Sequence, residues 1–410
     1  MARDREIAEA SASGVGKELC EKCGEIVLGM ERLAIRAQCL CDVCLHTKVL
    51  KKFKQACTQY ALVRPGDSVL LALSGGAGSR AMLGMIREGQ PFPRDPSAFT
   101  RVAVAHLIDE HRGSEKCTVA GACCREAAAE CGLEYFEESL IGEAEASASV
   151  LESLGDASDF EDIRRTQRRR RLLLMAHAHG FTKVMLGDTA DAIAARALEL
   201  LCKGRGSEIV AEGGYVDDRF ASAEDAHQMP FGVALVRPMR DVLQAEAAAD
   251  CCARGFSFIR EPLPSSMMKG GTELKDAGTL GDLSRAFISH QFHRQGAMAP
   301  LTLLRMVSRL KAHSFTLPLL TPARPPIERP QSVMEEHGEV AASRVQQIRA
   351  ENLCCVCDAP TELQSPIERV VCDACARMVE KATGSAANYF KVNSEGAGSW
   401  LQNSVGEFLL

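Results

Sequence analysis

Two groups of cysteines, one near each end of the sequence, have the spacing of metal ligands. In the C-terminal group, Cys354 and Cys357 form one C-x-x-C pair, and Cys372 and Cys375 form a second pair fourteen residues later. Each such turn points two thiolates at one tetrahedral ion, and the residues between the pairs bring the second pair back to the first. The spacing is typical of a zinc ribbon, with Cys355 as a bystander and unliganded thiols as the alternative.

The N-terminal group offers five cysteines for a second zinc site. Cys20 and Cys23 form one pair, and Cys41 and Cys44 form another after seventeen residues. Cys39 is a spare thiol, which could replace Cys41 only if the second pair were Cys39 and Cys44, five positions apart. A closed four-sulfur site has no open coordination position, so both metals would hold small modules together and catalyse nothing. We therefore expect two structural zinc ions.

The other cysteines lack metal-ligand spacing. They fall in alanine-rich stretches of helical pattern, where small buried side chains explain them best. The chain is read as intracellular, where thiols stay reduced, so disulfides are not expected. These residues are Cys57, Cys117, Cys123, Cys124, Cys131, Cys202, Cys251 and Cys252.

A glycine-rich segment directly follows a short apolar run. The run, residues 68–74, is expected to be a parallel strand buried on both faces. The segment after it lies between strand and helix, where backbone N–H groups can cradle an anion. Glycines there can also serve the turn alone. Its residues are Ser74, Gly75, Gly76, Ala77, Gly78 and Ser79.

The elements around this segment alternate between strands and helices. A further apolar run at 99–109, a short segment at 134–140 and the segment 182–188 predict strands, and helical patterns lie between them. The alternation predicts an α/β fold, a doubly wound parallel sheet flanked by N- and C-terminal zinc-binding modules. The expected units are a disordered tail at 1–17, a zinc module and helix at 18–60, the α/β core at 61–270, a helical extension at 271–313, a Pro-rich linker and helix at 314–350, and a zinc ribbon and tail at 351–410.

Composition limits the compartment and the partners. The 410 residues are 46% apolar and 25% charged, enough for a core of about 200–250 residues with smaller modules. No secretory signal and no membrane-spanning stretch are expected, which indicates the cytosol or nucleus and no membrane partner. Because the net charge is −6, contact with nucleic acid must use local basic patches. Two stand out: residues 164–171, and the lysines Lys48, Lys51, Lys52 and Lys54.

The glycine-rich segment resembles the SGGxxS loop of the PP-loop ATP pyrophosphatases. In that superfamily the loop grips the pyrophosphate of ATP while a target oxygen is adenylated. Active members usually carry Lys-Asp in the loop interior, where this chain has Ala77 and Gly78. The chain lacks a cation for the phosphates and a carboxylate that helps hold Mg²⁺, so the resemblance implies weak ATP binding.

The order of the motifs resembles the cytoplasmic tRNA 2-thiolation protein 2 family from about Cys20 to the C-terminus. The shared features are the two cysteine groups, the loop followed by Ala81, Met82 and Leu83, the sequence AHLIDE, and GRG at 204–206. The resemblance implies a cytoplasmic heterodimer with a catalytic PP-loop sister subunit. The heterodimer would act on the wobble uridine of tRNA, with sulfur from the thiocarboxylate of a ubiquitin-like carrier.

The same resemblance implies that this chain has no catalytic residue. Thiolating relatives carry a C-x-x-C just before the arginine-rich helix, where this chain has Asp-Phe-Glu-Asp at 159–162. Cys202 lies near the place of a third cysteine, but one thiol cannot hold an iron–sulfur cluster. Two alternatives stay open: an active ATP-dependent PP-loop tRNA sulfurtransferase that uses Cys202, and a zinc-ribbon scaffold protein outside tRNA modification.

Six arginines on a helix predicted at 163–180 could bind RNA. One interpretation is a solvated basic face partly paired with Glu161 and Asp162. The other is contact with tRNA phosphates, which would position the RNA without reading its sequence. The residues are Arg164, Arg165, Arg168, Arg169, Arg170 and Arg171.

Overall fold

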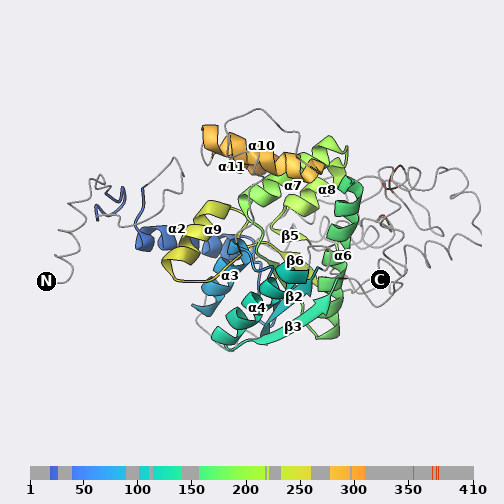
Figure 1. Cartoon of the computed structure of the whole chain (residues 1–410), viewed down its shortest axis with the longest axis horizontal. Helices are drawn as coiled ribbons and strands as arrows, with labels where there is room; N and C mark the ends of the chain where they lie inside the picture. Colours follow the sequence, from blue (N-terminus) through green and yellow to red (C-terminus); the bar gives the residue numbers. More distant parts are fainter. Residues whose placement is uncertain are drawn as a thin grey trace, which may run out of the picture.

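The structure is a computed structural model of the whole chain, drawn in Figure 1. It describes residues 19–25, 39–88, 101–109, 114–140, 157–217, 219–220, 232–259, 278–295 and 298–309, together with 354, 372, 375 and 377. The expected tail at 1–17 and linker at 314–350 lie outside this set, as does most of the expected C-terminal ribbon. None of the helices in the described part has the length and apolar character needed to cross a membrane.

One six-stranded sheet forms the centre of the molecule, in the order β3-β2-β1-β4-β6-β5. All neighbours are parallel except β5 and β6, which are antiparallel. The predicted α/β class is therefore confirmed, with an antiparallel edge that the sequence analysis did not anticipate. The strands are β1 Ser68–Ala72, β2 Arg101–Ile108, β3 Glu134–Ser139, β4 Lys183–Leu186, β5 Val216–Asp217 and β6 Ala234–Val236.

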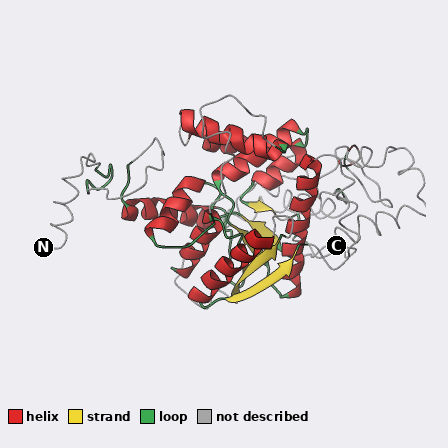
Figure 2. Ribbon diagram, viewed as in Figure 1, coloured by secondary structure: helices red, strands yellow, loops and turns green. Residues whose placement is uncertain are grey.

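Successive strand residues supply two separate cores because side chains alternate between the two faces of a sheet. Val69 and Leu71 of β1 pack with the helices α2, α3, α4 and α9, whereas Leu70 between them packs with α6 on the other face. Figure 2 shows the sheet enclosed between these helices. Their bounds are α2 Asp42–Gln59, α3 Ala77–Arg87, α4 Ser114–Glu130, α6 Ala157–Ala178 and α9 Gln244–Ala253.

A second helical layer covers α7, which follows β4. Helices α10 and α11 pack against α7 and lie together along one side of the molecule (Figure 1). The bounds are α7 Ala190–Cys202, α8 Gly206–Gly213, α10 Leu280–Gln295 and α11 Met298–Val307. These last two helices occupy the expected helical extension.

The N-terminal helix α2 is part of the main core. Val49 and Phe53 are fully buried there. Polar contacts to α9 run beside them: Nδ1 of His46 lies 2.8 Å from the buried carboxylate of Asp250, and Lys52 donates to Glu246 at 2.5 Å. The helix that contains Cys44 and follows Cys41 is therefore fixed to the α/β core by apolar and ionic contacts.

Candidate functional site

The glycine-rich loop lies at the carboxyl end of β1, beside the end of β4. Strand order reverses between these two strands, and ligands of open α/β sheets bind at such a point. Gly75 has a φ of 81°, a left-handed conformation that favours glycine. Its carbonyl accepts a hydrogen bond from the backbone of Ile259 at 2.8 Å, so the segment after α9 is tied to the loop.

The hydroxyl of Ser79 closes the loop from inside. It donates to the carbonyl of Gly76 at 3.0 Å and accepts from the backbone N–H of Ser74 at 3.3 Å. Ser79 is buried, and Ala77 is fully buried in the main core. These side chains therefore stabilise the turn, and Ala77 offers no cation to a phosphate.

Gly78 packs backbone to backbone against the end of β4. A Cβ atom at Gly78 would lie 2.3 Å from the carbonyl oxygen of Gly187, and one at Gly187 would lie 2.4 Å from the Cα of Ser79. Both distances are far below an ordinary carbon contact, so neither position accepts a side chain without a backbone shift. The place of the loop carboxylate in active PP-loop enzymes is thus closed by the fold.

We expect that restoring Lys-Asp by Ala77→Lys with Gly78→Asp does not create an ATP site. The added side chains should instead destabilise the protein by about 1–3 kcal/mol through overpacking. Denaturant unfolding and titration calorimetry with Mg-ATP measure the two effects. Gly206→Ala is the matched control because its Cβ meets no atom within 4 Å, so a change of at most about 0.5 kcal/mol is expected. Micromolar ATP affinity in a stable double variant would contradict this account.

A buried carboxylate stands at the end of β2, near the loop. Asp109 is buried and accepts hydrogen bonds from Arg164 and, at 2.6 Å, from Arg168. Burial, together with the neighbouring charge of Arg168, lowers the pKa of Arg164 to about 10. Two of the predicted RNA-binding arginines are therefore paired with Asp109 in the interior.

A second ionic cluster joins α6, α7 and the turn before α8. Asp162 accepts from Arg196 at 2.8 Å and from Lys203 and Arg205 at 2.7 Å each. Glu199, 1% exposed, faces Arg165 at 3.0 Å and also contacts Arg196 and Lys203. Burial acts to raise the pKa of both carboxyls, but these cations outweigh it, lowering the pKa of Asp162 and bringing that of Glu199 to about 2.

The arginine run is consequently an internal element of the fold. None of the six arginines is exposed, and Arg169 and Arg170 are buried. Arg169 pairs with Glu212 at 2.6 Å. The interpretation as a solvated face is wrong because carboxylates that follow β2 and belong to α7 and α8 lie against the helix. The expected pairing with Glu161 and Asp162 is present at Arg165, at 3.3 Å and 4.0 Å. Contact with tRNA through these arginines stays a prediction.

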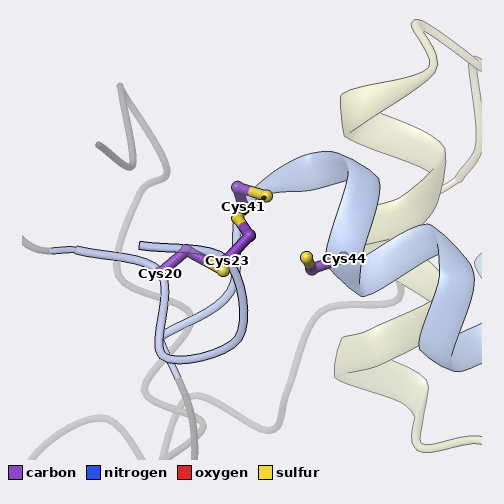
Figure 3. Close-up of side chains that lie close together, drawn as sticks. All are labelled: Cys20, Cys23, Cys41 and Cys44. Carbon is purple, nitrogen blue, oxygen red and sulfur yellow. Dashed lines mark hydrogen bonds between the residues drawn. The ribbon is translucent and has the colours of Figure 1, made fainter. Parts of the chain in front are cut away.

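The structure brings four N-terminal cysteines together. The sulfur atoms of Cys20, Cys23, Cys41 and Cys44 all lie within 4.8 Å of one another, whereas the spare Cys39 is outside the group. Figure 3 shows Cys44 on α2 facing the loop that carries Cys20 and Cys23. A backbone N–H of Cys41 lowers the pKa of Cys20 to about 6, while removal from water raises that of Cys44 to about 12. Four converging thiols fit a tetrahedral zinc ion, whose charge stabilises all four thiolates.

The C-terminal group is described in part. The sulfurs of Cys354, Cys372 and Cys375 lie within 4.8 Å of one another, and the backbone N–H of Cys372 faces the sulfur of Cys354 at 3.3 Å. Cys357, the fourth expected ligand, lies outside the described residues. The three positions fit the predicted ribbon, and the identity and number of the metals stay predictions.

The eight cysteines expected to be buried differ in exposure, and Cys117, Cys123 and Cys131 are half-buried. Cys57, Cys124 and Cys251 are buried, and burial raises the pKa of each to about 12. Cys202 and Cys252 are exposed, so the expectation of burial is wrong for these two. An iron–sulfur cluster does not fit beside Cys202, because positions 159–162 hold no thiol and Asp162 there is occupied by cations.

Comparison with known proteins finds relatives and a common fold. The chain is 30% identical over 265 residues to the cytoplasmic tRNA 2-thiolation protein 2 of Oryza sativa, covering 58% of this chain and 54% of that protein. The protein of the same name from Arabidopsis thaliana is 25% identical over 246 residues, or 53% and 50% of the two chains. The chain thus spans about half the length of these curated relatives. No family model matches.

Among solved structures, the U34-tRNA thiolase NcsA of Methanococcus maripaludis, determined with its [4Fe-4S] cluster, has the same fold. The TM-score is 0.52 with 15% sequence identity, over 71% of this chain and 87% of that chain. This similarity shows a shared fold, in agreement with the α/β sheet that the sequence predicted.

Proposed function

Because the chain is homologous to plant and animal proteins named cytoplasmic tRNA 2-thiolation protein 2, we propose that it is the non-catalytic subunit of a tRNA thiolase. Its catalytic partner would be a second PP-loop protein with an intact loop. The heterodimer would thiolate the wobble uridine of tRNAs in the cytoplasm, with sulfur from a thiocarboxylated ubiquitin-like carrier.

The observation that carries the non-catalytic assignment is the packing of Gly78 against Gly187. This packing leaves no room at Gly78 for the carboxylate that active PP-loop enzymes usually carry, and fully buried Ala77 stands in place of their lysine. An enzyme that cleaves ATP must stabilise the transition state more than the substrate, and it does so with positive charge at the phosphates, from a lysine or a bound metal ion. A core that keeps its fold but lacks these groups is suited to holding a partner and a substrate.

The proposal is tested by measuring 2-thiouridine at the wobble position in tRNA from cells that lack the chain. We expect the modification to be lost and to return with the wild-type chain. Cys202→Ala should restore it equally, because the proposed chemistry belongs to the partner. Mass spectrometry of proteins that co-purify with the tagged chain should identify a PP-loop protein.

Two results would favour the alternatives. If Cys202→Ala assembles normally but fails to restore thiolation, the chain takes part in sulfur transfer itself. If thiolation persists in cells without the chain, the scaffold outside tRNA modification becomes the better account.

A further inference from the structure

The outer surface of α10 and α11 combines exposed cations with exposed apolar side chains. Ile288 of α10 and Leu304 of α11 are buried against α7, so the opposite faces of both helices meet solvent. Phe287 and Met306 on those faces are 47% and 60% exposed. The exposed residues are Phe287, His290, Thr302, Arg305, Met306 and Arg309, and we name this set the outer helical face. Arg285 is also exposed but lies on another side of α10, two residues before Phe287 and 3.4 Å from Glu161 of α6.

The outer helical face has an excess of positive charge. Within 279–291 and 299–309 the only acidic residue is Asp282, which pairs with Arg285 at 2.6 Å. Arg305 and Arg309 form no ion pair with the residues that the structure describes, and Arg305 lies in the last turn of α11. On a chain with a net charge of −6, this is a local site of attraction for a polyanion.

The arginines of α6 are less suited to the same role. Arg164 and Arg168 share buried Asp109, and Arg165 faces buried Glu199. An RNA phosphate would have to displace these carboxylates and leave them buried without a counter-charge, which costs several kcal/mol. Cations on the outer helical face can meet a phosphate without such a loss.

We infer that the outer helical face binds tRNA, with Arg305 and Arg309 on backbone phosphates and Phe287 stacked on an unpaired base. The inference rests on the proposed function, for which it names the RNA-contacting surface. Exposed aromatic rings next to cations are the usual means of holding unpaired bases, which every tRNA displays in its loops. The supporting helix α7 begins at Ala190, three residues after Gly187, which contacts the glycine-rich loop.

The test measures binding of an unmodified tRNA transcript to the full chain, purified with its metals and co-purifying subunits, between about 50 and 200 mM salt. Arg305→Gln with Arg309→Gln should weaken binding about 10-fold and flatten the slope of log affinity against log salt by about 1.4–1.8, or roughly 0.7–0.9 per phosphate. Phe287→Ala should weaken binding about 5-fold or more with little change of slope. Arg64→Gln with Arg87→Gln, exposed arginines outside both basic patches, is the matched control and should change neither quantity.

Three results would overturn the inference. If the wild-type protein binds tRNA and the variants bind equally, the RNA contacts lie elsewhere and the proposed function stands. If the variants keep tRNA affinity but lose a co-purifying subunit, the outer helical face is a protein interface. If the wild type itself does not bind tRNA, both the inference and the proposed function fail. Thermal unfolding of each variant confirms folding, which we expect because all substituted side chains are exposed.

Discussion

Replacing Asp162 by asparagine is expected to lower the free energy of unfolding by about 3–5 kcal/mol, because three cations would then lose a buried counter-charge. Asp162 is 6% exposed and holds Arg196, Lys203 and Arg205 within 2.8 Å. Backbone and cation positions on α6, α7 and the turn before α8 all depend on this carboxylate. Guanidinium unfolding monitored by circular dichroism measures the loss.

Glu134→Gln provides the matched control. Glu134 also pairs with an arginine, Arg101, at 2.5 Å, but both side chains are well exposed, so about 1 kcal/mol or less is expected. An effect of Asp162→Asn no larger than this would contradict the account.

The stability of the protein should depend on pH because the pKa values of Asp162 and Glu199 are lowered on folding. Their stabilisation is present above about pH 4.5 and should be lost as the pH falls towards 2 in the wild type, and Asp162→Asn should flatten that decline.

Cys44→Ser is expected to remove about one zinc ion per chain and to unfold the N-terminal module. Binding of a structural zinc ion contributes about 10–16 kcal/mol in small zinc modules near neutral pH, and much of this depends on the fourth thiolate. Cys44 lies on α2 within the main core, so the loss should also expose that helix to proteolysis. Metal analysis of protein purified without added metal, expected near two zinc per wild-type chain, provides the measurement.

Cys39→Ser is the control for that experiment. Cys39 belongs to the same cysteine-rich segment but lies outside the four converging sulfurs, so its replacement should leave the zinc content unchanged. Loss of zinc in Cys39→Ser with retention in Cys41→Ser would show that the ligand set is wrong. A wild-type content near zero would remove both zinc assignments.

The sheet could be predicted where its strands are long enough to form continuous apolar runs. β1, β2 and β4 meet this condition, and β3 was also expected although its segment holds three glutamates. The two-residue β5 and three-residue β6 are too short to give a periodic signal, so the antiparallel edge was missed. The N-terminal helix was recognised, but its ionic contacts with Asp250 and Glu246 depend on residues about 200 positions away.

The cysteine positions could be predicted because metal ligands recur at short, fixed spacing. The role of the arginines could not, since their partners Asp109, Glu199 and Glu212 come from other elements. The sequence placed alanine and glycine in the loop and predicted weak nucleotide binding. Only the fold shows that Gly78 touches Gly187, a contact made by two strands that are distant in sequence but adjacent in the sheet.

The contact between α2 and α9 has a consequence during synthesis. His46 and its partner Asp250 are 204 residues apart, so at about 5–20 residues per second roughly 10–40 s separate their emergence from the ribosome. Throughout that interval Val49 and Phe53, fully buried in the finished protein, lack the cover that α9 supplies. The nascent chain should therefore expose the apolar face of α2 for many seconds, and chaperones that act at the ribosome bind surfaces of this kind.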